Sequence, residues 1–146
     1  MELIDEGMCF ICGKRNPIGL KAEFEIDSKN LRLTGHFTPG REHEGYKGLM
    51  HGGLASALLD EAMVKLLWEV GIPAVSASLN IRLRKPVKVG QRIVIEGWVE
   101  QDKGRIINTS AELRDTAGNV LAQAEGKCVR VKSKEESGET PHRQED

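Results

Sequence analysis

One stretch of this 146-residue chain constrains its fold more than any other. Residues 52–70 are almost entirely apolar and have the period of an α-helix, with Leu54 and Trp68 on one side and further apolar residues around most of the circumference. A helix with so few polar positions is predicted to be buried in the protein rather than to lie on its surface. Gly71 is expected to cap this helix, and Pro73 prevents its continuation.

The segments on either side of the predicted helix alternate between apolar and polar residues, which is the period of half-buried strands. Two such segments precede the helix and four follow it, with short polar or glycine-containing turns between several of them. The expected strands are residues 20–26, 31–37, 74–84, 91–100, 105–114 and 120–131. Gly97 interrupts one strand pattern and is expected to mark a bulge or a bend.

This order of elements indicates a fold class. One apolar helix is buried by a sheet only if the sheet curls around it. We therefore predict an α+β hotdog fold, in which a curled antiparallel sheet wraps around one long central helix. Residues 1–19 are expected to form an entry segment, 20–131 the hotdog domain, and 132–146 a charged, disordered tail.

Charge and hydropathy exclude several classes of protein. The chain has 21 Lys and Arg against 22 Asp and Glu, and this balance argues against a sequence-independent grip on nucleic acid. No apolar run approaches the ~20 residues of a membrane span. The acidic N-terminus lacks the basic start and apolar stretch of a signal peptide. We therefore expect a cytoplasmic protein that binds neither nucleic acid nor a membrane.

The three cysteines do not suggest a disulfide framework, because their number is odd and the expected compartment is reducing. Cys9 and Cys12 form a CxxC pair, which is typical of half a zinc site or of a redox pair. A structural zinc ion takes four ligands, and no second pair follows. We interpret the two residues as packing or turn residues and predict no metal site, with a zinc ion shared between chains as the alternative.

The segment MHGGLASALLD at residues 50–60 resembles the signature of the PaaI-type hotdog acyl-CoA thioesterases, including the THEM-like branch. Residues 9–20, 76–80 and 84–86 are similar to other parts of these proteins, so the resemblance covers roughly 9–131. It implies hydrolysis of an acyl-CoA to a free acid and coenzyme A. Coenzyme A would then be part of the substrate, and no cofactor is expected.

The start of the helix has the chemistry that thioester hydrolysis requires. The reaction needs donors for a developing oxyanion. The first amides of a helix lack intrahelical acceptors and lie at its positive end, and glycine allows a ligand to approach them closely. Gly52 is the predicted oxyanion donor, and Gly53 and His51 are predicted to contact the substrate. The alternatives are close packing of the helix start for the glycines and a capping role for His51.

Asp60 lies in the middle of the apolar helix, where a carboxylate is costly unless it is paired. The resemblance implies that it acts as general base or as nucleophile, and both roles stay open. The alternative is that Asp60 has a structural role and pairs with a residue of a strand. Glu61 points about 100° away from Asp60 and is expected to pair with Lys65 instead.

Spacing also predicts the assembly. Gly52 and Asp60 are eight residues apart, roughly 12 Å along a helix, so one small carbonyl cannot easily meet both in one chain. We expect a homodimer in which two antiparallel helices complete each active site together. Two dimers are expected to form a tetramer.

Several polar residues outside the helix are weaker candidates. On the resemblance, Ser76 is a catalytic assistant that positions water or substrate, although a serine on a strand is more often structural. Asn80 and Tyr46 are candidate ligand contacts. Arg84 and Lys85 suit the phosphates of coenzyme A, although a solvated strand face gives the same charge pattern.

Two other functions fit a hotdog domain. A non-catalytic acyl-CoA-binding module would have no need of Asp60, so the presence of this carboxylate favours an enzyme. A hotdog dehydratase needs a catalytic histidine and an acid in a different motif. His51 precedes the helix and the carboxylate lies within it, which makes a dehydratase the less favoured alternative.

Overall fold

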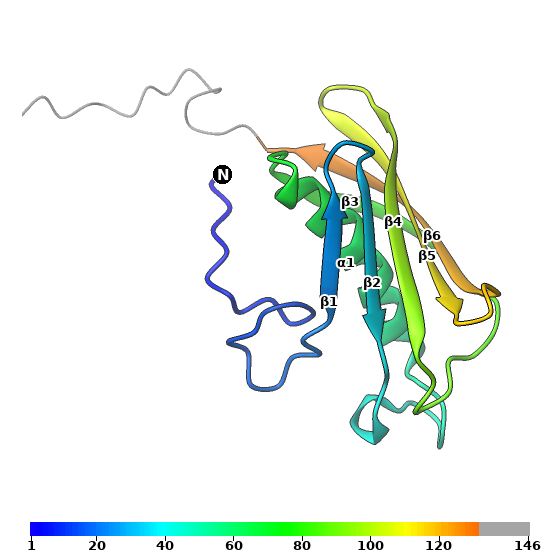
Figure 1. Cartoon of the computed structure of the whole chain (residues 1–146). Coiled ribbons are helices and arrows are strands. Elements are labelled where there is room, and N and C mark those ends of the chain that lie inside the picture. The colour runs from blue at the N-terminus through cyan, green and yellow to red at the C-terminus, as the bar shows by residue number, and fades with distance from the viewer. Residues whose placement is uncertain (132–146) are drawn as a thin grey trace, which may run out of the picture.

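A six-stranded antiparallel sheet curls around one helix in the computed structural model, which describes residues 1–131 (Figure 1). The helix is α1 (Gly52–Glu69), preceded by a short 3-10 helix, η1 (Arg41–His43). The strands are β1 (Glu23–Asp27), β2 (Arg32–Phe37), β3 (Ala74–Leu83), β4 (Ile93–Asp102), β5 (Ile106–Asp115) and β6 (Val120–Arg130). Their spatial order is β1-β2-β4-β5-β6-β3. The predicted hotdog fold is confirmed, and the predicted tail, 132–146, lies outside the described residues.

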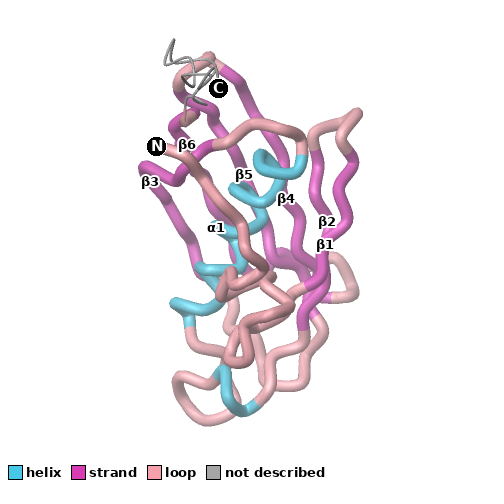
Figure 2. Tube along the Cα trace, turned by 90° about the vertical axis from the view of Figure 1, so that its left-hand side faces the viewer, coloured by secondary structure: helices cyan, strands magenta, loops and turns pink. Residues whose placement is uncertain are grey.

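The core lies between α1 and the concave face of the sheet (Figure 2). The buried residues of α1 are Ala55, Leu58, Leu59, Ala62, Met63, Leu66 and Leu67. They pack against strand residues such as Ile93, Ile95 and Leu113, which have no exposed surface. Each fully buried side chain of this size contributes roughly 1.5–3 kcal/mol. The opposite side of α1 is only half-buried and includes Asp60 and Glu61.

Both ends of α1 match the sequence prediction. Gly71 has a φ of 82°, a conformation that glycine adopts without strain, and its N–H donates to the carbonyl of Trp68. His51 is the N-cap residue. Among the described residues, no helix is both long and apolar enough to cross a membrane.

The first strand is shorter than its pattern predicts. β1 begins at Glu23 rather than at Leu20, because Lys21 has a φ of 54° and interrupts the extended backbone. The N–H of Leu20 donates to the carbonyl of Phe10 at 2.9 Å. The segment before β1 is therefore bonded to the turn at residues 9–13, the N-terminal turn, rather than to the sheet.

Gly97 marks a close approach, not the bulge that its pattern suggests. The register shift in β4 lies between Val99 and Gln101. A Cβ at Gly97 would lie 2.6 Å from the carbonyl oxygen of Ala62, so α1 packs directly against the sheet backbone at this glycine. The obstructing atom belongs to helix backbone, which cannot rotate away as a side chain can.

We expect Gly97→Ala to lower the free energy of unfolding by about 3 kcal/mol, because the added methyl group forces α1 off the sheet. The matched control is Gly126→Ala on β6, where a Cβ would lie 2.9 Å from the Sδ of Met63 and 3.0 Å from the Oγ1 of Thr109. Both obstructing atoms belong to side chains and not to helix backbone, and the methionine is flexible, so the control is expected to lose about 1 kcal/mol or less. Urea denaturation measures both, and equal losses would contradict the explanation.

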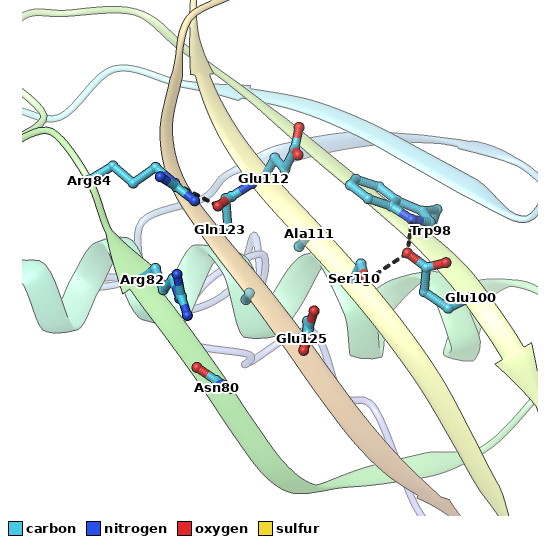
Figure 3. A pocket seen from close by; sticks show the side chains of 11 residues that line it. Asn80, Arg82, Arg84, Trp98, Glu100, Ser110, Ala111, Glu112, Gln123 and Glu125 are labelled. Atoms are coloured by element: carbon cyan, nitrogen blue, oxygen red, sulfur yellow. Dashed lines mark hydrogen bonds between the residues drawn. The ribbon is translucent and has the colours of Figure 1, made fainter.

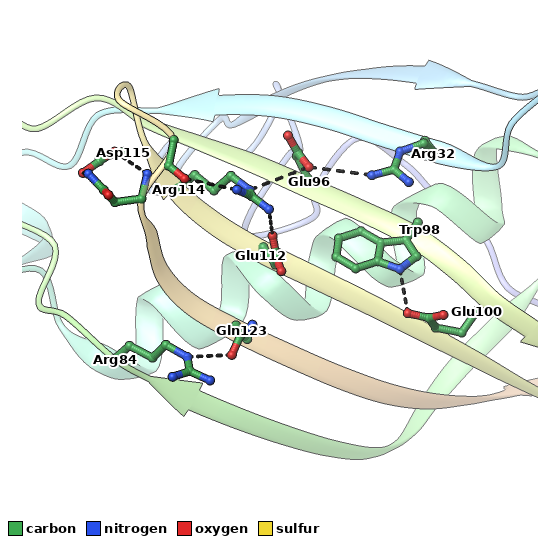
Figure 4. Close-up of polar contacts among 11 residues, drawn as sticks. Arg32, Arg84, Glu96, Trp98, Glu100, Glu112, Arg114, Asp115 and Gln123 are labelled. Atoms are coloured by element: carbon green, nitrogen blue, oxygen red, sulfur yellow. Dashed lines mark hydrogen bonds and ion pairs between the residues drawn. The ribbon is translucent and has the colours of Figure 1, made fainter.

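The outer face of the sheet carries a network of charged side chains (Figure 4). Glu96 lies 3.7 Å from the guanidinium of Arg32 and 4.0 Å from that of Arg114, which also pairs with Glu112. Arg32 lies over the ring of Trp98, 5.1 Å from its centroid. Partly exposed pairs of this kind contribute about 1 kcal/mol or less each, so the apolar face holds the domain together.

Candidate active site

A pocket of about 550 Å³ lies between the loop before α1, the start of that helix and the segment after β3. Its volume is in the range of sites for small-molecule ligands. Its lining includes the predicted site residues Tyr46, His51, Gly52, Arg84 and Lys85. Much of the remaining lining is apolar: Leu49, Met50, Ala55, Leu83, Pro86, Val87 and Ala122. The pocket thus joins a helix N-terminus to an apolar wall and two cations.

The hydrogen bonds of the first helical turn single out the amide of Gly52. The Nδ1 of His51 accepts from the N–H of Gly53 at 2.9 Å. The carbonyl of His51 accepts from the N–H groups of Leu54 and Ala55. Within residues 1–131, no acceptor is assigned to the N–H of Gly52, which lines the pocket. The N–H of Gly52 is therefore available to donate to an oxyanion, whereas the N–H of Gly53 already donates to the imidazole of His51.

Packing also constrains the two glycines. A Cβ at Gly52 would lie 2.9 Å from the Cδ1 of Leu83 on β3, and a Cβ at Gly53 would lie 2.9 Å from the imidazole of His51. Close packing thus accounts for part of the need for glycine here. The capping role of His51, which the sequence left as an alternative, is confirmed by its bond to Gly53.

Asp60 lies outside this pocket and is paired with Ser76. The Oγ of Ser76, on β3, donates to the Oδ1 of Asp60 at 2.5 Å. A short hydroxyl bond to a carboxylate is charge-assisted, and it fixes the orientation of the carboxylate. The structure therefore brings together the predicted catalytic carboxylate and its predicted assistant. The alternative, in which Asp60 has a purely structural role, also predicts a hydrogen bond to a strand residue, so this bond agrees with both roles.

Cys128 lies close to this pair but is not suited to act as a nucleophile. Its side chain is fully buried, and burial raises the pKa of its thiol above the ordinary value. Hydrogen bonds with Thr109 and with Ser76 lower this pKa, and the negative charge of Asp60 raises it further. The thiol of Cys128 is therefore harder to deprotonate than that of an exposed cysteine.

Asn80 lies apart from both groups. Figure 3 shows it on the outer face of the sheet with Arg82 and Glu125, where they line a separate hollow of about 340 Å³. A register shift between Ser76 and Ser78 in β3 explains this position. In a regular strand Ser76 and Asn80, which are four residues apart, would share one face of the sheet. The extra residue between them moves Asn80 to the opposite face.

Arg84 lies between the two hollows and lines both of them. Its Nε donates to the Oε1 of Gln123 at 2.6 Å, which is drawn in Figure 3. Lys85 follows it at the pocket, and its backbone N–H donates to the carbonyl of Leu121 at 3.0 Å. The chain after β3 is thus anchored to β6, which holds both cations beside the pocket.

The expected pair between Glu61 and Lys65 is replaced by other contacts. Lys65 pairs with Glu69 at 2.9 Å. Glu61 instead accepts from the Sγ of Cys12 at 3.1 Å and from the Sγ of Cys9 at 3.4 Å. Burial raises the pKa of the Cys12 thiol, and the hydrogen bond and negative charge of Glu61 raise it further. Sequence reasoning missed this cluster because about 50 residues separate Glu61 from the CxxC pair.

The pocket and the Asp60–Ser76 pair lie in the part of the chain that matches a known family model. Residues 47–122, more than half of the chain, match the model of the Thioesterase superfamily. The chain belongs to the thioesterase superfamily. The family match runs from the loop before α1 into β6, so it includes Gly52, Asp60 and Ser76.

Individual members of the superfamily are also similar. The chain is 38% identical to human acyl-coenzyme A thioesterase 13 over 85 residues, which are 56% of this chain and 61% of that protein. It thus spans less than two thirds of the length of this relative. The Escherichia coli PaaI protein of the phenylacetic acid degradation operon superposes with a TM-score of 0.72 and 18% identity, covering 78% of this chain and 82% of its own.

A Streptococcus mutans protein bound to acetyl-CoA superposes with a TM-score of 0.70 and 17% identity. The superposition covers 75% of this chain and 88% of that one. At these identities the solved structures support the hotdog fold alone. The resemblance to PaaI-type thioesterases that the helix motif indicated is confirmed by the family match and these relatives together.

Proposed function

We propose that this protein is an acyl-CoA thioesterase whose active site is completed by a second copy of the chain. One observation carries the proposal. Gly52, whose N–H has no acceptor among residues 1–131, lines the pocket, whereas Asp60 is held by Ser76 outside it, roughly 12 Å farther along the same helix. Each chain thus offers two half-sites. The relative named for acyl-coenzyme A and the neighbour bound to acetyl-CoA support this choice of substrate class.

The edge of the sheet supports a two-fold dimer. β3 lies at the end of the strand order, with β6 as its neighbour on one side. It exposes Leu79 and Leu83, whose relative exposures are 42% and 54%. A long edge strand with apolar side chains readily pairs with another strand. Pairing of two β3 strands with antiparallel α1 helices would place the pocket of one chain beside the Asp60–Ser76 pair of its partner. A tetramer of two dimers stays a prediction.

In the proposed reaction the acyl group packs against the apolar wall of the pocket. The thioester oxygen accepts a hydrogen bond from the N–H of Gly52. Arg84 and Lys85 bind the phosphates of coenzyme A. Asp60, oriented by Ser76, removes a proton from water as the water oxygen attacks the carbonyl carbon. The C–S bond then breaks, and the proton passes to the departing thiolate. In the other route Asp60 attacks directly and water hydrolyses the resulting anhydride.

Both routes consume one water molecule and yield one free acid and one thiol, so we propose that no cofactor takes part. The proposed location is the cytoplasm, which fractionation of cells that express the protein would test. We regard a dehydratase as less favoured because the Nδ1 of His51 is engaged in capping α1.

The test is release of free thiol from a panel of aryl-, short-chain and long-chain acyl-CoAs by the full-length protein. We expect turnover of at least one class, with kcat/KM differing at least 100-fold between the best and worst substrates because the pocket wall is apolar and bounded. Tight binding of acyl-CoA with no thiol release from any member would overturn the proposal in favour of a binding module. Hydration of an enoyl-CoA without thiol release would favour a dehydratase.

A further inference from the structure

A cluster of metal-binding side chains lies outside the proposed active site. Cys9 and Cys12 of the N-terminal turn lie against Glu61 on the half-buried side of α1. One ligand atom from each of the three residues lies within 4.8 Å of the others. In a tetrahedral zinc site, with Zn–S of about 2.3 Å and Zn–O of about 2.0 Å, sulfur and oxygen ligands are about 3.5 Å apart. Each sulfur lies close to that separation from one carboxylate oxygen of Glu61: the Sγ of Cys12 is 3.1 Å from Oε1, and the Sγ of Cys9 is 3.4 Å from Oε2.

The backbone turn that presents the two thiols is tightly specified. The N–H of Gly13 donates to the carbonyl of Cys9 at 2.8 Å. A Cβ at Gly13 would lie 2.4 Å from the backbone nitrogen of Cys9, so this position accepts only glycine. Ile11, between the two cysteines, is buried in the core and anchors the turn against the domain. The two sulfur atoms are therefore held on one side of a rigid turn.

The charge of Glu61 is poorly compensated by the protein itself. No lysine, arginine or histidine of residues 1–131 forms an ion pair with this carboxylate. Its hydrogen-bond donors are two thiols, which are weak donors. A half-buried carboxylate with such partners lacks the cation that usually accompanies it. Among the common divalent ions, zinc is the one best suited to a site of two cysteine sulfurs and one carboxylate.

One of the three side chains, Cys12, borders a hollow at the surface. Cys12 lines a hollow of about 810 Å³ between the N-terminal turn, β1, β2 and the end of α1. Lys65 lines the same hollow and brings a positive charge to the anionic ligand set. Water can occupy the fourth position of a metal ion from this side.

We propose that Cys9, Cys12 and Glu61 bind one zinc ion, with water as the fourth ligand, and that this ion fastens the N-terminal turn to α1. The two thiols lose their protons to solvent as the Zn–S bonds form, because the thiolate is the metal ligand. Neither the resemblance to thioesterases nor the proposed reaction requires such an ion. The inference is independent of the proposed function, because metal binding is measured without any turnover. The zinc ion would fix the position of α1 at Glu61, which is next to Asp60 in the sequence but lies on a different face of the helix.

The test uses the full-length protein, purified with a non-chelating reductant and analysed for zinc by mass spectrometry. We expect one zinc ion per chain, and after exchange for Co²⁺ we expect the near-ultraviolet absorption of thiolate-to-cobalt charge transfer. Cys9→Ser and Cys12→Ser are expected to weaken Co²⁺ binding at least about 100-fold and Glu61→Gln about 10-fold. Zinc should also protect Cys9 and Cys12 from iodoacetamide until a chelator is added.

Matched controls keep the test decisive if a cysteine variant unfolds. Glu69→Gln removes a carboxylate that lines the same hollow as Cys12 but is not one of the three proposed ligands, and Cys128→Ala removes the thiol outside the cluster; both should retain the metal. Glu61→Gln keeps the shape of the side chain and one acceptor oxygen for the two thiols, and circular dichroism would verify that it folds. Absence of zinc and of the cobalt–thiolate band in the reduced protein would overturn the proposal. Equal metal binding by Glu61→Gln and the wild type would overturn the assigned ligand set.

Discussion

Replacing Asp60 by asparagine is expected to lower kcat for acyl-CoA hydrolysis by at least about 1,000-fold. Asparagine has nearly the same shape, and its side-chain oxygen can still accept a hydrogen bond from the hydroxyl of Ser76, so the variant should fold. It cannot remove a proton from water, nor form the anhydride of the direct route. The measurement is kcat and KM for the best substrate of the acyl-CoA panel, together with thermal unfolding followed by circular dichroism.

Two companion variants show whether the effect is specific to Asp60. Ser76→Ala removes only the group that orients the carboxylate, and we expect a loss of about 10-fold in kcat. Glu69→Gln changes a carboxylate of the same helix that pairs with Lys65, and it should stay within about twofold of the wild type. An Asp60→Asn protein with more than a tenth of the wild-type kcat would remove Asp60 from the mechanism.

Mixing two inactive variants should restore about a quarter of the wild-type activity, because each proposed active site draws on both chains of a dimer. One variant is Asp60→Asn. The other is Gly52→Val, whose side chain would meet the Cδ1 of Leu83 and is expected to block the proposed binding of the thioester oxygen at Gly52. In a heterodimer both changes fall in one site and the other site is intact. Random reassembly makes about half of the dimers heterodimers, each with one of two sites working.

The experiment distinguishes a shared site from a site within one chain. Heterodimers isolated through two different affinity tags should have about half of the wild-type activity per dimer. If Gly52 and Asp60 of the same chain acted together, every site in the heterodimer would carry a change and no activity would return. Each variant must first be shown to be folded and dimeric alone, by circular dichroism and sedimentation.

Local patterns were sufficient to predict the fold. The period of residues 52–70 and the alternation of the flanking segments identified the helix and the six strands, because both periods come from backbone geometry alone. His51 and Gly71 marked the ends of the helix for the same reason, since capping depends on residues next to each other in the chain. The candidate carboxylate and the candidate oxyanion donor were likewise apparent from their places on one helix.

Contacts between distant segments were decided only by the tertiary structure. The extra residue in β3 places Ser76 against Asp60 but moves Asn80 to the outer face, and alternation alone cannot locate such a bulge. Gly97 is required by the path of α1 across the sheet, not by its own strand. The pairing of Glu61 with Cys9 and Cys12 joins segments about 50 residues apart.

The chain by itself therefore determined one long buried helix, a sheet curled around it, and a helix motif with the residues for thioester chemistry. The tertiary structure decided which of those residues meet. It separated the Gly52 pocket from the Asp60–Ser76 pair, and it added Glu61 to the CxxC turn. The physical reason is that secondary structure follows from short-range periodicity, whereas neighbours in space depend on the curl, register and bulges of the whole sheet.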